Sequence, residues 1–502
     1  MVKDNRLKWD RLLSTERQRN SISNSSTNDN SINNHRNEFE ADYDRIVGSS
    51  SVRRLQDKAQ VFPLQQNDVV RTRLTHSLEV SSIARSLGKA VGMEIIEQKK
   101  DPEFKQEYIS QVCALLQTAG LIHDLGNPPF GHYGETVIRD WFSKWFEDFE
   151  SIESRYHNIF KEELRILPEQ KTDYIYFDGN VQNIRIVTKL QALNDRYGAN
   201  FTYGTLATLI KYPWRSNTRR TEEKGKYGYF YSESDIVGKI YNSTGLKENV
   251  RHPLTYLLEA ADDITYICDD IEDGVKKSVI NWKIEYSNIM DEIDFESEED
   301  FKSIDDKMKK FREKRKEEFG EAVNGGYSNF PEDILSDVRN FRNIVQGKLI
   351  FAARDKFLEM YDEIMSGTFG EKELLGDKKW KKLCDAIKNV TRRNCYNCKE
   401  VLSLELVGDK VIRTLLETFV GTLIFSNKDQ VDDTRTYEGK LYSIISSNYK
   451  FINCINCLED EIKPFDKLSI YERIQLCVDF ISGMTDSYAV NLYKQLLGVE
   501  LP

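Results

Sequence analysis

The 502-residue chain has a formal net charge of −11 and 39% hydrophobic residues. A chain of this length can bury a large core and form two or three subdomains. Its acidic balance argues against general coating of nucleic acid and against binding to anionic membranes. A small polyanionic substrate stays compatible with it, because a metal ion and a few basic side chains can invert the charge inside one pocket.

The N-terminal residues and the cysteines indicate the cellular compartment. The chain starts Met1-Val-Lys-Asp-Asn-Arg, without the apolar segment of a signal peptide, and no apolar run is long enough to cross a membrane. Eight cysteines in a chain of this length are typical of reduced thiols. We therefore expect a cytoplasmic protein with no membrane partner.

The first elements in chain order are a polar tract and two helices. Residues 20–34 are rich in Ser and Asn and cannot bury enough surface to order themselves, which predicts a mobile loop within an N-terminal segment, 1–38. A helix is expected from Phe39 to Arg54. The next helix is expected to start within 71–80, with Thr75 as a candidate N-cap.

The stretch 122–135 is the densest in chemistry, because it holds two of the six histidines and two carboxylates. The residues before it, 108–123, are apolar at close to helical period, which predicts a buried helix. Gly126 and the Pro128-Pro129 pair end that helix, since proline cannot continue it. A second helix is expected to follow, with an apolar face over 137–146.

The two ends of this stretch carry different candidate groups. His123 and Asp124 are expected in the last turn of the first helix, where an imidazole nitrogen and a carboxylate oxygen can meet one cation. His132 and Glu135 are expected to open the second helix. For His123-Asp124 taken alone, the alternative is a hydrogen-bonded pair without metal.

A third acidic signal lies in 253–270, where a proline at a plausible first helical position opens an apolar segment. Asp262, Tyr266 and Asp270 recur at i, i+4 and i+8, so one stripe of the helix carries all three. Acidic groups among apolar neighbours are costly unless they are paired or bound to metal. The alternative is an acidic face exposed to solvent.

Together these motifs predict a metal site made of His76, His123, Asp124 and Asp262. Mixed nitrogen and oxygen ligands suit octahedral Mn, Fe, Co or Mg better than a closed tetrahedral zinc site. For His76 taken alone, the alternative is a core or capping histidine.

The rest of the chain carries two weaker signals. Residues 296–321 predict a long charged helix with a solvated face. The pairs Cys395-x-x-Cys398 and Cys454-x-x-Cys457 have zinc-ligand spacing. They form either a structural zinc site or a set of ordinary reduced thiols.

The order His, His-Asp, Asp resembles that of the HD-domain phosphohydrolases, and within them the chain is similar to the bacterial deoxyguanosine triphosphate triphosphohydrolases (dGTPases). The matching motifs are Arg-Arg-Leu-Gln-x-Lys-x-Gln-Val-Phe-Pro (53–63), Arg-Thr-Arg-Leu-Thr-His-Ser (71–77), His-Asp-Leu-Gly-Asn-Pro-Pro-Phe-Gly-His-x-Gly-Glu (123–135), Phe-Asp-Gly-Asn-Val-Gln (177–182), Lys-Tyr (211–212), Glu-Ala-Ala-Asp-Asp-Ile-x-Tyr (259–266) and Phe-Ile-Ser-Gly-Met-Thr-Asp-x-Tyr (480–488).

The resemblance implies an all-α fold, an HD-domain helical bundle with an additional helical C-terminal region. The catalytic core would span 39–290. Residues 291–502 would complete the substrate pocket and make the oligomer contacts.

The resemblance also assigns roles at the site, beginning with His76, His123, Asp124 and Asp262 as ligands of Mn or Mg, with Fe, Co or Ni as alternatives. His132 would be the catalytic histidine and Glu135 would orient it. The substrate-binding residues would be Arg73 and Lys211 at the phosphates, Gln60, Val61, Tyr266 and Asp270 at the sugar and base, and Glu405 and Lys440 at guanine.

The activity implied is hydrolysis of dGTP to deoxyguanosine and inorganic triphosphate, by attack of a metal-activated water at the α-phosphorus. The alternatives are a broad-specificity dNTPase, an HD-type nuclease or phosphodiesterase, and a non-catalytic nucleotide sensor. Two departures from the family pattern weaken the prediction that guanine is the only base accepted. The family's Phe-Glu-Gly-Asn-Ala-Gln motif has Asp178 and Val181 in this chain, and Lys440 stands where an arginine near the base is expected. The resemblance also implies a homo-oligomer, a hexamer in this family, and regulation by single-stranded DNA.

Overall fold

The computed structural model describes residues 6–19, 36–64, 69–156, 165–191, 195–322, 328–456 and 461–499. Over these ranges the chain is almost wholly helical, and the only two-stranded sheet pairs β1 (Ile455–Asn456) with β2 (Glu461–Ile462) in antiparallel register. The all-α prediction is confirmed. The predicted loop 20–34 lies outside the described residues, and no helix within them is long and apolar enough to cross a bilayer.

The chain folds into two compact units that interleave along the sequence. Unit 1 comprises 1–6, 60–120 and 253–403, and unit 2 comprises 7–59, 121–252 and 404–502. The ranges predicted as domains, 39–290 and 291–502, each contribute to both units. The role predicted for 291–502 stays a prediction.

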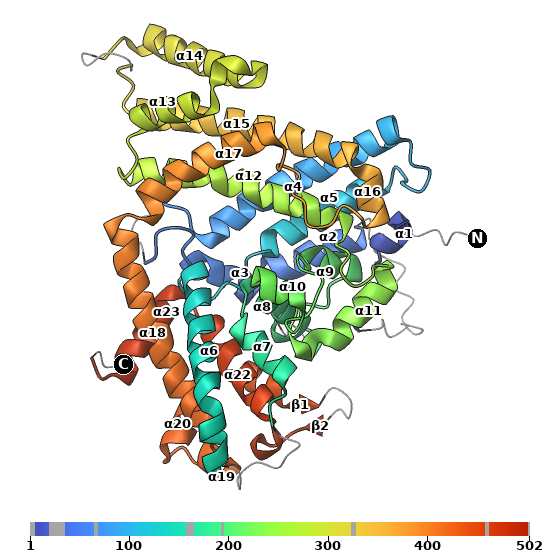
Figure 1. Ribbon diagram of the computed structural model, residues 1–502, viewed down its shortest axis with the longest axis vertical. Helices are drawn as coiled ribbons and strands as arrows, with labels where there is room; N and C mark the ends of the chain where they lie inside the picture. Colours follow the sequence, from blue (N-terminus) through green and yellow to red (C-terminus); the bar gives the residue numbers. More distant parts are fainter. Residues whose placement is uncertain are drawn as a thin grey trace, which may run out of the picture. The chain divides into compact units, whose positions relative to one another are not determined.

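Unit 1 is built around one buried helix, α12 (Pro253–Lys276), which packs on its neighbours α4, α15 and α17 (Figure 1). Its other elements are α4 (Arg73–Glu94), η2 (Ile95–Lys99), α5 (Tyr108–Ile122, which continues into unit 2), α13 (Trp282–Ile293), η6 (Phe295–Ser297), α14 (Glu299–Phe319), α15 (Asp333–Glu359), α16 (Tyr361–Ser366), α17 (Lys378–Thr391) and η7 (Arg392–Tyr396). The proline predicted at a first helical position begins α12. The apolar side of α12 is buried at Leu257, Ala261 and Ile264.

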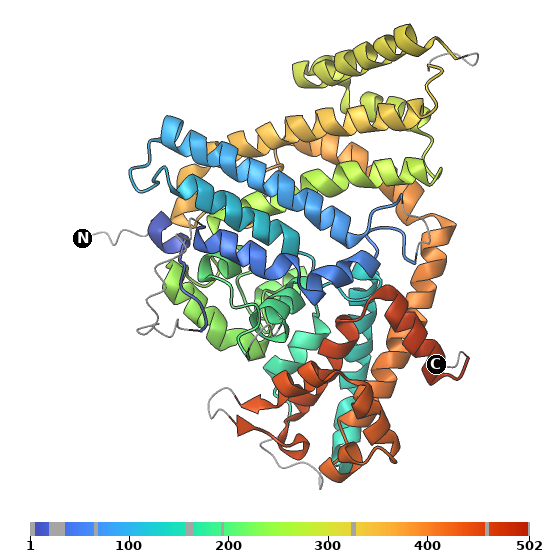
Figure 2. The ribbon, with the colours of Figure 1, turned by 180° about the vertical axis from the view of Figure 1, so that it is seen from behind.

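Helices α4 and α5 run side by side, as the light-blue and teal ribbons of Figure 2 show. Small residues permit this approach: a Cβ on Gly88 would lie 2.6 Å from Leu116 Cδ1, and one on Gly120 would lie 2.7 Å from Ser81 Cα. Because a side chain at residue 120 would meet backbone, the crossing requires glycine there.

Two sequence predictions about helix starts need correction. The N-cap of α4 is Thr72, whose hydroxyl oxygen accepts a hydrogen bond from the Thr75 amide. Thr75 lies inside the helix, and its hydroxyl oxygen accepts from the Thr72 amide. Residues 39–54 are not one helix, because the chain breaks after α2 (Glu38–Val47) and Ser49 caps α3 (Ser50–Arg54). A Ser or Thr can cap a helix only where its backbone is extended, and the pattern of apolar residues did not show where that is the case.

The charged helix predicted at 296–321 is confirmed as α14, but it is not solvated all round. Phe301, Ile304 and Met308 are buried on one face, and the Phe301 ring packs edge-on against Trp380 with centroids 6.1 Å apart. A helix of high charge therefore still docks through one apolar stripe.

Unit 2 holds the remaining elements. They are α1 (Trp9–Leu12), α2, α3, η1 (Leu55–Asp57), α6 (Gly131–Tyr156), α7 (Pro168–Ile175), α8 (Gly179–Arg185), η4 (Ile186–Leu190), α9 (Tyr203–Leu209), α10 (Arg219–Lys224), η5 (Tyr231–Glu233), α11 (Ser234–Thr244), α18 (Lys399–Leu423, which starts in unit 1), α19 (Lys428–Asp432), α20 (Tyr437–Ile444), α21 (Ser447–Cys454), η8 (Phe465–Lys467), α22 (Ile470–Ser482) and α23 (Asp486–Leu496).

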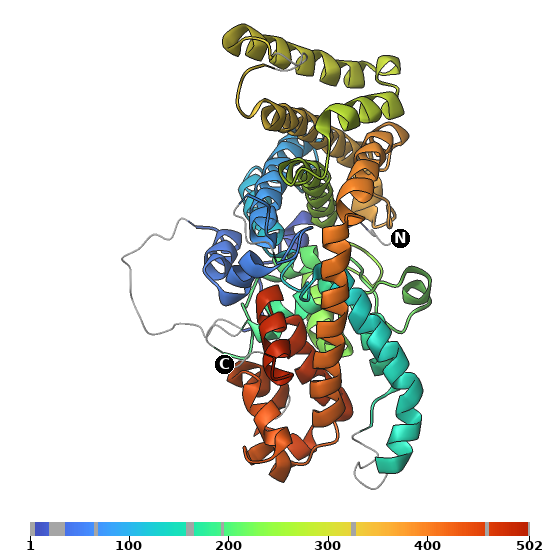
Figure 3. The ribbon, with the colours of Figure 1, turned by 90° about the vertical axis from the view of Figure 1, so that its left-hand side faces the viewer.

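The long helix α18 runs beside α6, as Figure 3 shows, and also contacts α22. The Arg413 guanidinium lies 3.9 Å from the Asp140 carboxylate on the α6 side. On the α22 side, the rings of Phe419 and Phe480 meet edge to face, with centroids 5.2 Å apart. Helix α18 therefore contacts both α6, which carries His132 and Glu135 at its start, and α22.

Candidate functional site

The loop that joins α5 to α6, residues 123–130, is the centre of the site in unit 2. Helix α5 ends at Ile122, so His123 and Asp124 lie in the turn that follows it, one residue beyond the predicted last turn. Helix α6 begins at Gly131, as predicted within a residue or two. Phe130 takes a positive φ of 61° just before α6, a strained conformation for a side chain of that size.

Motifs far apart in the sequence converge on this loop. The Lys58 ammonium donates to the carbonyl oxygens of Asn127 and Ser482, and the Asp486 carboxylate accepts from the amide of Phe130 at 2.9 Å. Gly126 lies so close to α8 that a Cβ on it would sit 2.0 Å from the Gly179 carbonyl oxygen. The motifs around residues 58, 179 and 486 therefore fix the backbone of the loop.

His132 and Glu135 form a pair at the start of α6. The His132 Nδ1 atom lies 3.2 Å from a Glu135 carboxylate oxygen. The imidazole is 80% exposed, while the carboxylate is 2% exposed. Because the buried Glu135 carboxylate fixes the exposed His132 imidazole, the ring can meet a substrate in one orientation.

The Glu135 carboxylate is itself held on its other side. It accepts the Gly179 amide at 2.8 Å, and the Lys226 ammonium lies 3.9 Å away and pairs with Asp178. Burial alone would raise the pKa of Glu135, but the hydrogen bond with His132, the His132 charge and the Lys226 charge outweigh burial and lower it. Glu135 therefore stays ionised and can stabilise a protonated His132.

In unit 1, α4 and α12 bring His76 and Asp262 together. The His76 Nε2 atom lies 3.1 Å from an Asp262 oxygen, and the His76 ring is only 1% exposed. Arg71, on the chain entering α4, is tied to α12 by ion pairs with Glu272 at 2.9 Å and Asp273 at 2.8 Å. This network makes Arg71 a structural residue that fixes the start of α4.

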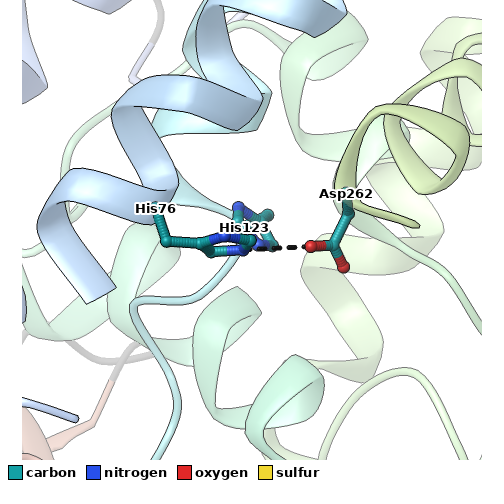
Figure 4. Close-up of side chains that lie close together, drawn as sticks. All are labelled: His76, His123 and Asp262. Atoms are coloured by element: carbon teal, nitrogen blue, oxygen red, sulfur yellow. Dashed lines mark hydrogen bonds and ion pairs between the residues drawn. The ribbon is translucent and has the colours of Figure 1, made fainter. Parts of the chain in front are cut away.

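His76, His123 and Asp262 bring one ligand atom each into a single group in which all three atoms lie within 4.8 Å of one another (Figure 4). It is the only such group of three or more His, Cys, Asp or Glu among the described residues. Two imidazoles and a carboxylate at this spacing fit a divalent transition metal or Mg.

The fourth predicted ligand, Asp124, lies next to this group in sequence. One of its oxygens is 3.6 Å from the His123 Nε2 atom and accepts from the Asn127 side-chain amide at 2.6 Å. Asn127 is 4% exposed. A buried amide that orients a ligand carboxylate is typical of the support around metal sites.

The stripe predicted on α12 is present. Burial, followed by the charges of Asp263, Asp262 and Asp270, raises the pKa of Tyr266, whose ring carries the Lys388 ammonium 5.0 Å from its centroid. Asp270 is buried and accepts a hydrogen bond from the Tyr396 hydroxyl. Burial raises the pKa of Asp270 to about 6, against the hydrogen bond from Tyr396.

The remaining predicted binding residues lie on several elements. In unit 1, Arg73 is 3% exposed at the start of α4, Val61 is half-buried, and the buried side-chain oxygen of Gln60 accepts no hydrogen bond from the described residues. In unit 2, the Lys211 ammonium lies 5.8 Å from the Tyr212 ring centroid, Glu405 is half-buried on α18, and Lys440 is exposed on α20. Their contact with a nucleotide stays a prediction.

Glu405 has one structural link to the central loop. A Cβ on Gly408 would lie 2.7 Å from the Phe130 ring, so α18 packs closely on that ring. Burial raises the pKa of Glu405. The charge of Glu405 acts in turn on Tyr133, beside His132.

Three of the four cysteines of the predicted zinc site lie among the described residues. Cys395 is buried, and its thiol lies 3.8 Å from the Asp270 carbonyl oxygen, while Cys398 is half-buried. Cys454 is buried and Cys457 lies outside the described residues. The alternative of ordinary thiols therefore stays open.

Four supporting residues were missed at the sequence level: Asn127, Gly179, Lys226 and Tyr396. Asn127 and Gly179 stand inside the motifs quoted above. An amide side chain and a glycine next to acidic residues in those motifs could have indicated that they support the site. Lys226 and Tyr396 lie outside those motifs, and nothing local marks them.

Comparison with known proteins adds a family model and full-length relatives. The HD domain model matches residues 73–171. The deoxyguanosinetriphosphate triphosphohydrolase-like protein of Listeria innocua is 38% identical over 500 residues, covering 98% of this chain and 100% of that protein. The deoxyguanosinetriphosphate triphosphohydrolase of Salmonella typhimurium is 30% identical over 494 residues, covering 92% of this chain and 94% of that protein.

Proposed function

Because the chain belongs to the deoxyguanosinetriphosphate triphosphohydrolase family of HD-domain enzymes, we propose that it hydrolyses dGTP to deoxyguanosine and inorganic triphosphate. The observation that carries the proposal is the group of His76, His123 and Asp262. Two imidazoles and a carboxylate at this spacing suit a divalent ion, and such an ion suits a phosphate ester as substrate.

The metal would be held by His76, His123, Asp124 and Asp262, with Mn or Mg as the ion. When bound, it lowers the pKa of a water molecule and offsets charge on the phosphate oxygens. Asn127 keeps the Asp124 carboxylate in one orientation by its 2.6 Å hydrogen bond. This support favours a fixed ligand set over a flexible one.

His132 would transfer a proton at the reacting phosphate. With Nδ1 donating to Glu135, its Nε2 atom is left to exchange the proton with substrate or water. Glu135 is a positioning residue, because it holds the ring and stabilises its charged form. The Gly179 amide and Lys226 keep Glu135 in place and ionised.

The substrate contacts would divide by chemistry. Arg73 and Lys211 would hold phosphate oxygens, where charge-assisted bonds are strongest. Tyr266 would pack on the deoxyribose and Asp270 would accept from its 3′-hydroxyl. The contacts to the base and adjoining sugar are assigned to Gln60, Val61, Glu405 and Lys440.

The bond that breaks follows from these assignments. Asp262, Tyr266 and Asp270 lie on successive turns of α12, so a sugar held by the second and third residues lies next to the metal ligand. The phosphorus nearest the sugar is therefore the one presented for attack. The triphosphate should leave as one unit.

The experiment is to incubate the purified protein with each dNTP and with GTP, in the presence of Mn or Mg, and to separate products by anion exchange. We expect deoxyguanosine and inorganic triphosphate without dGDP or dGMP. Stoichiometric dGMP with pyrophosphate, or dGDP with orthophosphate, would place the attack at another phosphorus. A His123→Ala protein purified in parallel controls for contaminating phosphatases.

We also propose, from family membership, that the chain forms a homo-oligomer and that single-stranded DNA regulates it. Size-exclusion chromatography with light scattering tests the first. Initial rates measured with and without an oligonucleotide test the second.

A further inference from the structure

Unit 2 contains a large open cavity that the proposed function does not use. It encloses about 1080 Å³. Its lining residues come from the N-terminal segment, from α2 and α11, and from the start of α9 with the chain before it; those used below include Arg11, Arg17, Arg19, Arg45, Asn200 and Lys239. None of them belongs to the proposed catalytic or substrate site. We call it the basic cavity.

The charge of the basic cavity runs against that of the whole protein. Its described lining residues include four arginines and a lysine, against the two glutamates Glu16 and Glu38, in a chain whose net charge is −11. Excess positive charge in a concave site attracts anions, because the walls concentrate the field. The lining itself therefore indicates the sign of a ligand.

Part of this positive charge is not balanced by the protein. Arg11 donates to the carbonyl oxygens of Asn242 and Ser243, and Arg45 donates to that of Asn200 at 3.0 Å. Among the described residues, no carboxylate lies within 4.0 Å of the charged group of Arg11, Arg45 or Lys239. Neutral carbonyl groups orient Arg11 and Arg45, and the charges of Asp42 and Glu38 act on Arg45 from beyond 4.0 Å.

Two guanidinium groups are held close together on one atom. Arg17 and Arg45 both donate to the Asn200 carbonyl oxygen, at 2.6 and 3.0 Å. Burial, followed by repulsion from Arg17, lowers the pKa of Arg45. Two like charges converge at a cost, and an anion between them would relieve it.

The framework beneath the guanidinium groups is rigid. The fully buried Asp42 carboxylate accepts from Arg17 at 2.5 Å and from the hydroxyls of Thr202 and Thr205 at 2.7 and 2.9 Å. Asn200 sits at a positive φ of 50°, and its side-chain oxygen accepts from the Arg19 amide at 3.1 Å. A purely structural role accounts for Arg17, which pairs with Asp42. It leaves Arg45 and Lys239 unexplained.

We propose that the basic cavity binds a polyphosphate chain, either free inorganic triphosphate or the triphosphate of a nucleotide. Arginine forks match phosphate oxygens in pairs, and several positive charges in one cavity suit a ligand with several negative charges. Among the described lining residues Tyr203 is the only aromatic one, and it is 6% exposed. Recognition therefore rests on the phosphates and is indifferent to the base.

The test is isothermal titration of the full-length protein with inorganic triphosphate in a buffer containing EDTA, which removes metal-dependent binding at the proposed active site. Arg45→Gln/Lys239→Gln should weaken binding by about a hundredfold, since each of the two lost charge-assisted contacts is worth roughly a factor of ten. The matched control is Arg435→Gln/Lys467→Gln, which removes the same charge from exposed positions elsewhere in unit 2. It should bind like the parent.

Initial dGTP hydrolysis should stay at the parental level in both double variants, which separates this proposal from the proposed function. If Arg45→Gln/Lys239→Gln does not fold, Lys239→Glu alone serves, because Lys239 is exposed. The proposal is overturned if the parent binds no triphosphate, or if the cavity variants bind it as well as the control. Binding of a single-stranded oligonucleotide without binding of triphosphate would also overturn it, in favour of a nucleic-acid surface.

Discussion

A single methyl group added at residue 179 should slow the enzyme without replacing any side chain of the proposed active site. A Cβ added to Gly179 would lie 2.7 Å from a Glu135 carboxylate oxygen and 2.7 Å from the Asn127 side-chain oxygen. Both atoms are the ends of side chains, so they should move aside and the fold should survive. The Glu135 that orients His132 and the Asn127 that orients Asp124 would then be displaced together.

The magnitude follows from the contacts that are lost. The 2.8 Å bond from the Gly179 amide to Glu135 has an ionised acceptor, and such bonds are worth about 1.5–3 kcal/mol. If the displaced Glu135 no longer stabilises the charged His132 in the transition state, a loss of that size lowers kcat by roughly ten- to a hundredfold. Overpacking should cost about 1–3 kcal/mol of stability.

The assay is the steady-state rate of dGTP hydrolysis by Gly179→Ala, with circular dichroism to check folding. Gly238→Ala is the matched control, because a Cβ there meets no atom within 4 Å. In the double variant Gly179→Ala/Glu135→Gln, the loss of rate should be smaller than the product of the two single losses, since both changes act on the contact between Gly179 and Glu135. A folded Gly179→Ala protein with the parental kcat would refute the reasoning.

Four further outcomes are expected. His123→Ala should lose its bound metal, measured by elemental analysis, together with turnover, while the helical dichroism is kept; a metal-free variant with full activity would contradict the ligand assignment. His132→Ala should keep its metal and lose about two to four powers of ten in turnover, the usual span for general acid–base loss. Metal loss in that variant would instead place His132 among the ligands. Tyr266→Ala should narrow the preference for dGTP over GTP, because the ring would meet a 2′-hydroxyl; equal parental rates on both nucleotides would exclude a steric gate. Burial raises the pKa of Asp173 from 3.8 to about 7, so the folded state keeps a proton that the unfolded state loses between these values. The free energy of unfolding, followed by the urea midpoint, should therefore fall by up to about 4 kcal/mol as the pH rises through that window. The same pH dependence in Asp173→Asn would assign the effect to another group.

The sequence was informative where one short segment determines the structure. The Pro-Pro pair and the apolar period on either side predicted a helix, a break and a second helix, and the structure has α5, the loop 123–130 and α6 in that order. The family resemblance implied the pairing of His132 with Glu135, which stand three residues apart at the start of α6. Local geometry suffices for such features.

Contacts over long sequence separations could not be predicted in the same way. Lys226 lies near Glu135 although they are 91 residues apart in the sequence, and Tyr396 donates to Asp270 although they are 126 residues apart. Nothing in the residues around Lys226 or Tyr396 distinguishes them from other surface-forming lysines and tyrosines. Only the packing of distant helices gives them a role.

The uninterrupted helix α12 sets a fixed length scale for the substrate. Asp262 and Tyr266 are four residues apart on it, which is about 6 Å along the axis at the usual helical rise. If Asp262 holds the ion and Tyr266 touches the sugar, backbone hydrogen bonds define the interval between them, and no loop movement can change it. The distance along α12 therefore selects the substrate by length. A substrate whose reacting phosphorus lay one phosphate further from its sugar could not place that phosphorus at Asp262 and its sugar at Tyr266 at the same time.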